Sequence, residues 1–309
     1  MSMSLNRTQI AAKIEAAEGT AEALTNAEAF LAFRQGDPQP DVKMAERDPF
    51  RDTLSQLPAL ATMRSAKFPF QVELAGSGTA GTAPFWGKLL KACGFAETIT
   101  PGTSVVYAPA STAIPSMTLA AYMDGVIFKT WGARGNLKIS GQIDKPIVMP
   151  LEYQGADFSQ LDGAMLANVN YSNIIPPPFI GGTFTLDGVP FLINKFDIDL
   201  ANVLALRSDP NSASGNKSCL ITGRKPKITL DPEMMLASTK DIWTMWKNGT
   251  TGALSIVLGA TAGNIVTIAI PKFQIQDVKF GERTSLRTNS ITALLAMDDG
   301  DDEITITLT

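Results

Sequence analysis

Large apolar residues alternate with polar or small ones along much of this chain. Segment 68–74 is a clear case, in which every second residue from Phe68 to Leu74 is large and apolar. Such alternation places the apolar side chains on one face of a β-strand and the other side chains on the opposite face. Because the pattern recurs as far as the last residues, the sequence predicts a mainly β fold built from antiparallel strands, as a β-sandwich or barrel.

Asp-Gly pairs separate several of these alternating segments. Asp124-Gly125 follows segment 117–123, and Asp187-Gly188 follows segment 184–186. Both residue types tolerate positive φ, which two-residue hairpin turns require. Further strands are predicted at 126–128, 137–140, 189–193, 196–200, 217–222, 227–230, 273–278, 290–297 and 303–309.

The longest uncharged stretch, residues 248–271, has the length of a membrane-spanning helix. It nevertheless contains four glycines, and its apolar residues alternate at 254–258 and again at 266–270, on either side of a turn at 261–264. This pattern favours a β-hairpin over a membrane span. We therefore expect no membrane insertion.

Two segments, 84–93 and 239–247, have helical rather than alternating patterns. In the second, Ser238 followed by Asp241 indicates the helix start, and Gly249 indicates its end. Each half of the chain is therefore expected to carry one short helix among its strands.

The stiff segment Ile175–Phe179, which contains three prolines, separates the two halves. At roughly 150 residues per domain, a chain of 309 residues has room for two domains. We predict a first β domain over 66–175 and a second over 176–309. Residues 1–65 have few alternating apolar positions, so they are predicted to form an extended N-terminal arm that orders only against another surface.

The chain contains no histidine, and its 30 acidic and 26 basic residues give a net charge of −4. Histidine-based catalysis and histidine metal sites are thereby excluded, and a weakly acidic chain lacks the positive field that holds nucleic acid. Cys93 and Cys219 lie in apolar patterns that indicate buried thiols, and residues 1–10 have no secretory signal, so a cytoplasmic protein is expected. We predict no catalytic residue, cofactor or metal.

One glycine-rich loop, Gly76–Gly81, matches the spacing of a dinucleotide-binding fingerprint between a predicted strand and a predicted helix. The preceding strand alternates like a half-exposed antiparallel strand, and no strand-helix series follows. A surface loop is therefore the favoured interpretation, and a nucleotide-binding enzyme remains the alternative.

An acidic cluster precedes the last predicted strand. Its spacing does not match the twelve-residue calcium loop, so a charged hairpin turn is the simpler interpretation, and a loop that faces a channel and repels DNA is the alternative. Its members are Asp298, Asp299, Asp301, Asp302 and Glu303.

Short motifs follow one another in a distinctive order along the whole chain. In the first half they are Glu18-Gly19-Thr20, a long charged arm, Phe68–Leu74 running into Ala75–Thr79, Leu89–Phe95, Tyr107-Ala108-Pro109, Asp124-Gly125 and Trp131–Asn136. In the second half they are Ile221–Arg224, Asp231-Pro232-Glu233, a late hairpin, Ile270-Pro271 and an acidic turn before a terminal strand. In this order the chain resembles the major tail tube proteins of long-tailed, siphovirus-like bacteriophages.

The resemblance implies a structural virion protein, made in the host cytoplasm, that joins edge to edge into rings. Stacked rings form a tail tube through which double-stranded DNA passes without being held. Two tandem units in one chain would give a ring of three chains with pseudo-sixfold symmetry, and a single unit would give a ring of six.

The expected partners are other copies of the chain, a tape-measure protein inside the tube, and the tail terminator and distal tail proteins. Another virion or secretion-tube component, including one from a contractile system, is the alternative within this class. Contacts between rings are expected in segment 44–64, at Met44, Asp48, Phe50, Leu54, Leu57 and Arg64.

Overall fold

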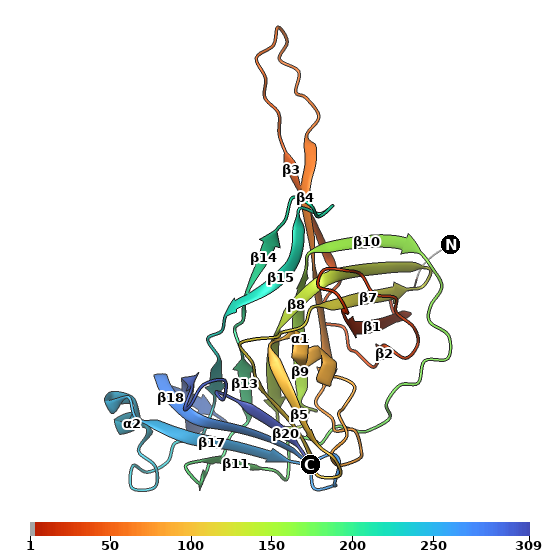
Figure 1. Cartoon of the computed structure of the whole chain (residues 1–309). Coiled ribbons are helices and arrows are strands. Elements are labelled where there is room, and N and C mark those ends of the chain that lie inside the picture. Colours follow the sequence, from red (N-terminus) through yellow and green to blue (C-terminus); the bar gives the residue numbers. More distant parts are fainter. Residues whose placement is uncertain (1–3) are drawn as a thin grey trace.

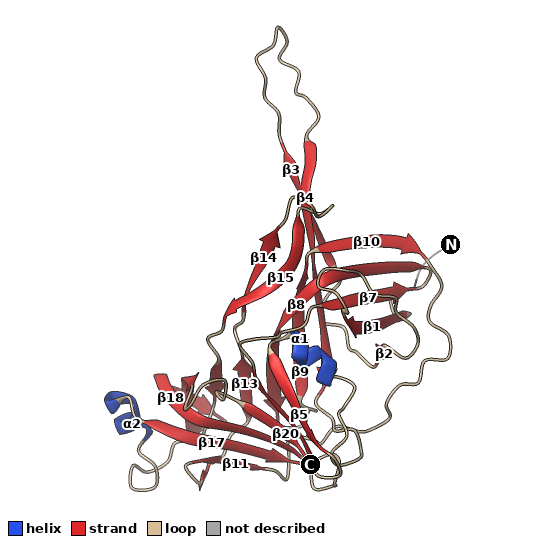
Figure 2. Cartoon of the chain, in the orientation of Figure 1, coloured by secondary structure: helices blue, strands red, loops and turns tan. Residues whose placement is uncertain are grey.

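The computed structural model describes residues 4–309, which form a mainly β structure whose paired strands are antiparallel (Figures 1 and 2). Among these residues, no helix has the length and apolar character that crossing a membrane requires. The first half contains β1 (Thr8–Ile14), β2 (Ala29–Phe30), β3 (Gln39–Ala45), β4 (Leu60–Glu73), α1 (Gly87–Ala92), β5 (Phe95–Thr100), β6 (Ser104–Pro109), β7 (Met117–Met123), β8 (Val126–Gln142), β9 (Val148–Gly155) and β10 (Asp157–Asp162). The second half contains β11 (Thr183–Leu186), β12 (Val189–Pro190), β13 (Lys195–Asp199), β14 (Val203–Ser208), β15 (Asn216–Gly223), β16 (Lys227–Leu230), α2 (Ile242–Asn248), β17 (Thr251–Leu258), β18 (Val266–Arg283), β19 (Leu286–Ala296) and β20 (Thr305–Leu308).

Strand β8 connects the layers of the molecule. Up to Ala133 it pairs with β7 and β10, and from Arg134 onward it pairs with β9 and β13. Gly132, one residue before the end of the first section, has a φ of +61°, a conformation that glycine adopts without steric cost. The pairing with β7 is irregular at this point, so the backbone can bend just before the strand changes its partners.

Most of the strands form two long antiparallel runs that share β18, while β2, β1, β7 and β10 join β8 in a third run and β14 pairs with β15. One run has the order β12–β11–β17–β18–β20–β6–β5, and the other has the order β3–β4–β9–β8–β13–β16–β19–β18. The predicted β-sandwich is confirmed, because the apolar faces of these strands meet in one core cluster that extends from Ala12 to Leu308.

The two halves of the chain are joined through this core and through strand pairing. First-half β8 pairs with second-half β13, and β6 pairs with β20. The loop between β10 and β11, residues 163–182, includes the segment at which we predicted the domain boundary. Both halves contribute to the same core. The division into two domains stays a prediction.

Both Asp-Gly turns form as predicted. Asp124-Gly125 connects β7 to β8 and Asp187-Gly188 connects β11 to β12, with positive φ at all four residues. The uncharged stretch forms the predicted hairpin, in which β17 pairs with β18. The two predicted helices are present as α1 and α2, but α2 begins after Asp241, whose carboxylate accepts a hydrogen bond from the Thr244 amide at 2.9 Å. The predicted start at Ser238 is thus wrong, because Asp241 is itself the capping residue.

The N-terminal 65 residues are more integrated than an arm that orders only against another surface. Strand β1 pairs with β7 along its whole length, and Ala11 and Ala12 are fully buried. Only the part around β3 projects from the body (Figure 1). Strand β1 has no alternating pattern of large apolar residues that would predict it, because small alanines occupy its buried positions.

The glycine-rich loop packs against the turn between β17 and β18. The Gly76 amide donates to Asn264 Oδ1 at 2.8 Å, and the Gly78 amide donates to the Gly263 carbonyl at 3.0 Å. A Cβ atom on Gly76 would lie 2.0 Å from the Gly263 oxygen. These glycines therefore permit close contact between the two halves, and two amides that a phosphate would need are already bonded.

We expect Gly76→Ala to lower the free energy of unfolding by roughly 2 to 3 kcal/mol, because its methyl group would push the two loops apart. Urea unfolding followed by tryptophan fluorescence measures the change. Thr79→Ala, in an exposed position of the same loop, is the matched control and should unfold like the wild type. Equal stability of the two variants would contradict the packing role of Gly76.

Candidate assembly surfaces

A long hairpin formed by β3 and β4 stands clear of the body at the top of the molecule (Figure 1). Ala45 pairs with Leu60, and the loop 46–59 extends beyond this last pair. All seven residues of β3 are exposed. A strand with no partner on its outer side and no covered face is typical of a surface that another chain completes.

Polar contacts fix the foot of this hairpin. Arg64 Nε and Nη2 donate to the Asp157 carboxylate at 2.5 and 3.1 Å. The Arg64 amide donates to the Ser214 carbonyl, and Asn216 Nδ2 donates to the Arg64 carbonyl, each at 3.0 to 3.1 Å. The β14–β15 ribbon of the second half therefore supports the hairpin where it leaves the body, and Arg64 has a positioning role.

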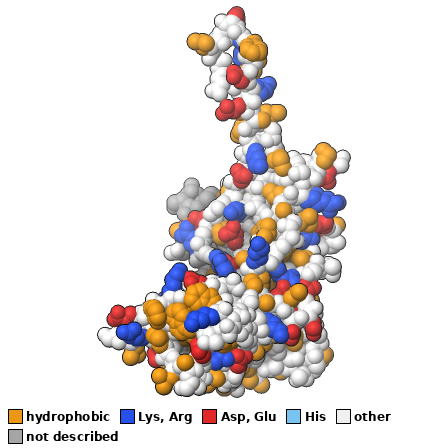
Figure 3. Space-filling view, turned by 90° about the vertical axis from the view of Figure 1, so that its left-hand side faces the viewer, with side chains coloured by type: hydrophobic (Ala, Val, Ile, Leu, Met, Phe, Trp, Pro, Cys, Tyr) orange, Lys and Arg blue, Asp and Glu red, His pale blue; other side chains and the backbone are white. Residues whose placement is uncertain are grey.

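The loop at the end of the hairpin carries large apolar side chains in solvent. The relative exposures of Phe50 and Leu54 are 110% and 106%. Met44 is 57% exposed, Asp48 is also exposed, and Leu57 is half-buried. In the space-filling view the hairpin shows hydrophobic and charged side chains side by side (Figure 3). Of the residues predicted to contact another ring, the structure thus exposes four, half-buries Leu57, and pairs Arg64 within the chain.

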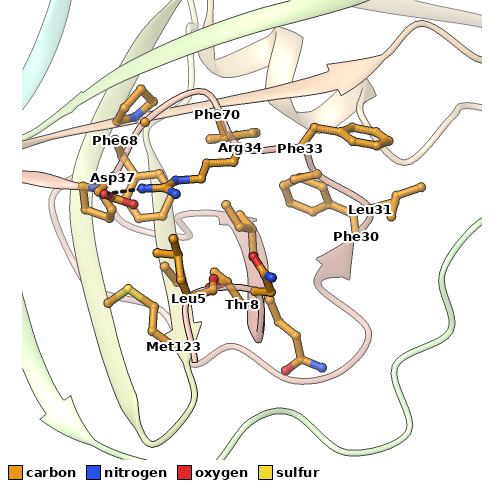
Figure 4. A pocket seen from close by; sticks show the side chains of 18 of the residues that line it. Leu5, Thr8, Phe30, Leu31, Phe33, Arg34, Asp37, Phe68, Phe70 and Met123 are labelled. Atoms are coloured by element: carbon orange, nitrogen blue, oxygen red, sulfur yellow. Dashed lines mark hydrogen bonds and ion pairs between the residues drawn. The ribbon is translucent and has the colours of Figure 1, made fainter. Parts of the chain in front are cut away.

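An apolar groove of about 620 Å³ lies beside the foot of the hairpin. Segments distant in sequence line it: most of residues 4–10 and 30–38, part of β4, the end of β7 with the start of β8, Gln160 and Tyr171. In Figure 4, Leu5 and Met123 lie across the cavity from Arg34 and Asp37, with Phe30, Leu31 and Phe33 at one end. No local sequence pattern predicts this groove, because only the fold brings these segments together.

One surface ion pair lines the groove, and a second lies between lining residues in the sequence. Arg34 Nη2 lies 2.7 Å from Asp37 Oδ2, and Arg7 Nη1 lies 2.6 Å from Asp124 Oδ1. The arginine side chains are 55% and 66% exposed, so solvent screens both pairs and their contribution to stability is small. Both guanidinium groups can therefore exchange partners at little cost.

The acidic cluster folds into a loop that satisfies most of its own charges. The Asp302 carboxylate accepts hydrogen bonds from the amides of Asp299 and Asp298 at 2.9 and 3.0 Å, and these bonds lower its pKa. Asp298 forms an ion pair with Lys272 at 3.1 Å. Asp299 is the only member whose carboxylate has no partner among residues 4–309.

Arg224 holds the other end of this loop. Its Nε donates to Glu303 Oε1 at 2.9 Å, and its Nη2 pairs with Asp301. Ser111 Oγ donates to Asp301 Oδ1 at 2.6 Å, and this bond, followed by the pairing with Arg224, lowers the pKa of Asp301. In the part of the chain that the structure describes, no group of His, Cys, Asp and Glu side chains is arranged to hold a metal ion.

A second exposed apolar surface lies on α2. Trp243 stacks near Trp246 and Phe280, with ring centroids 5.9 and 4.9 Å apart, and Phe280 is 69% exposed. In Figure 3, hydrophobic side chains gather on the lower part of the molecule, away from the hairpin. The helical pattern of 239–247 predicted α2, but it gave no sign that Phe280, on β18, completes this aromatic cluster.

Both cysteines are free and buried. Burial raises the pKa of Cys93 to about 12 and that of Cys219 to about 11. Neither thiol is therefore reactive at neutral pH, in agreement with the buried thiols predicted from the sequence.

We expect Arg224→Met to lower the free energy of unfolding at pH 7 by about 2 kcal/mol, because it leaves the half-buried Glu303 carboxylate without its partner. The folded-state pKa of Asp301 is lowered, so its contribution is complete above about pH 4 and is lost as the pH falls through that lowered pKa. The difference between variant and wild type should therefore shrink at pH 3.

Urea unfolding at pH 7 and pH 3 measures this difference. The control is Arg51→Met, which removes an exposed arginine on the hairpin loop. A difference from wild type at pH 7 no larger than that of the control would show that Arg224 does not hold the acidic loop.

Comparison with protein families supplies one match: a model described as phage tail tube protein matches residues 6–309. A search among curated proteins finds no matching relative.

Proposed function

This chain belongs to the family of phage tail tube proteins, and from that premise we propose that copies of it close into rings which stack into the DNA channel of the tail. Membership of the family makes it a structural component of the virion tail. The observation that best supports stacking is the projecting β3–β4 hairpin, because Phe50 and Leu54 at its end are fully exposed. A structural protein that stays monomeric gains nothing from presenting such side chains to water.

Rings require contacts between neighbouring copies in the plane. The run β12–β11–β17–β18–β20–β6–β5 ends in β5 on one side and in the short β12 on the other, and each of these strands has a single partner. Their outer backbone groups are available for strand pairing with another chain. Head-to-tail pairing of two different edges closes into a ring when the rotation per subunit divides a full turn.

The order of elements favours two tube units in each chain. In the first half, hairpin β3–β4 precedes α1 and hairpin β5–β6 follows it. In the second half, ribbon β14–β15 precedes α2 and hairpin β17–β18 follows it. This repetition supports a ring of three chains with pseudo-sixfold symmetry, whereas a ring of six chains would make each whole chain one unit.

Passage of DNA needs a wall that does not bind phosphate. The net charge of −4 provides no general attraction for a polyanion. Within the acidic loop, Asp299 is the carboxylate best placed to face DNA, since Asp298, Asp301, Asp302 and Glu303 are engaged inside the protein. The same lumen would hold a tape-measure protein before DNA enters, and the tail terminator and distal tail proteins would cap the two ends of the tube.

Replacing loop 46–59 by Asn-Gly should leave rings that do not stack. Ala45 and Leu60 are paired, so a two-residue turn can join them without disturbing the strands. Negative-stain microscopy and sedimentation compare tubes with free rings. A variant that keeps the loop length but carries Phe50→Ser and Leu54→Ser separates the effect of length from that of apolar contact. Tubes of wild-type length from the Asn-Gly variant would contradict the role of the hairpin.

Free rings from the Asn-Gly variant also reveal the number of chains. Each wild-type chain has a mass of 32.9 kDa. Native mass spectrometry should give three times the subunit mass if the two halves act as separate tube units. A mass of six subunits would instead show that the whole chain is the repeating unit.

A further inference from the structure

The groove beside the foot of the hairpin presents apolar side chains to solvent. Leu5 is 62% exposed, and Leu31 and Tyr171 are each 39% exposed. Beneath them lie the buried rings of Phe30, Phe68 and Phe70, which also line the cavity. A cavity of about 620 Å³ with an aromatic floor has room for one or two large apolar side chains.

The end of the hairpin carries side chains of the kind that such a groove accommodates. Phe50 and Leu54 are the two most exposed large apolar residues among those described, and they lie on a loop that reaches away from its own body (Figure 1). Aromatic and aliphatic anchors that enter a pocket provide most of the energy of many interfaces.

The loop and the groove both carry charges of mixed sign. Asp48 and Asp52 lie on either side of Phe50, and neither forms an ion pair with any residue in 4–309. The same loop also carries two arginines and a further glutamate, so residues 46–59 have a net charge of −1. The groove is lined by the ion pair of Arg34 with Asp37. Neither surface has a large net charge, so the match between them rests on the apolar side chains.

The groove lies at the foot of the hairpin, and the loop lies at its far end. The groove is lined by Phe68 and Phe70 at the foot of β4, while Leu54 lies at the far end of the same hairpin. The 14 residues from Leu54 to Phe68 span at most roughly 45 Å at about 3.3 Å per residue. A second copy displaced by this length along the hairpin would present its groove to the loop of the first.

We propose that the groove receives the loop 46–59 of a second copy in the adjacent ring, with Phe50 and Leu54 inserted among its apolar side chains. This inference rests on the proposed tube function and identifies the receptor for the hairpin. The hairpin length then sets the spacing between rings, which should not exceed about 45 Å.

The first test is a cross-link between copies. The paired substitutions Phe50→Cys and Leu5→Cys should form a disulfide between subunits under mild oxidation of assembled tubes. Background reaction is low, because Cys93 and Cys219 are buried. Each single substitution alone is the control and should give no cross-linked species across rings.

The second test places a charge in the groove. Leu5→Arg should allow rings but raise the protein concentration needed for stacking by about tenfold or more, since the guanidinium would oppose apolar burial. Leu236→Arg, at another exposed leucine outside the groove, is the matched control and should stack like the wild type.

The outcomes separate this inference from the proposed function. Tubes from the wild type, without a cross-link in the double variant and with normal stacking of Leu5→Arg, would overturn the groove assignment and leave the tube function intact. A wild-type chain that forms neither rings nor tubes at high concentration would overturn both. A ring spacing well above 45 Å, measured by electron microscopy, would also exclude insertion of the loop into this groove.

Discussion

Burial of alternating apolar faces in one continuous core is the constraint on which this structure depends. Long strands contribute to more than one layer: β8 changes partners after Ala133, and β18 pairs with β17, β19 and β20. The two halves are consequently held together by strand pairing and by shared core residues rather than by a linker. A body of this kind is rigid enough to support a projecting hairpin, because its side chains are packed at the density of a solid.

The end of the hairpin is exposed rather than buried in this core. Burial of its apolar side chains against another chain would favour assembly. Burying a side chain such as Phe50 or Leu54 contributes about 1.5 to 3 kcal/mol, part of which is offset by ordering of the loop. One such contact is weak, but in the proposed tube a ring would engage its neighbour through three or six hairpins at once. Multivalent contact of this kind would make stacking of completed rings more stable than stacking of single chains. Under this proposal, weak individual contacts favour ring closure before tube growth.

Much of the fold could be predicted from local patterns, and the failures have physical causes. Strand β16 and both Asp-Gly turns were found because large apolar residues and turn residues mark them. The turn between β18 and β19 was missed, since Thr284 and Ser285 adopt positive φ without the residues that normally indicate it. The expectation that segment 44–64 contacts another ring followed from the family resemblance, and it stays a prediction. The groove could not be predicted, because it exists only where segments far apart in the sequence meet.

The relation between groove and loop also bears on what limits the length of a tube. A contact that joins the foot of one hairpin to the end of another connects two different surfaces, and such a contact does not close on itself along the axis. Every added ring offers a new set of free loops on one side and free grooves on the other. Under this proposal nothing in the chain counts the rings, so the length must be set by another component. A tape-measure protein inside the lumen would be a partner of this kind under the proposal.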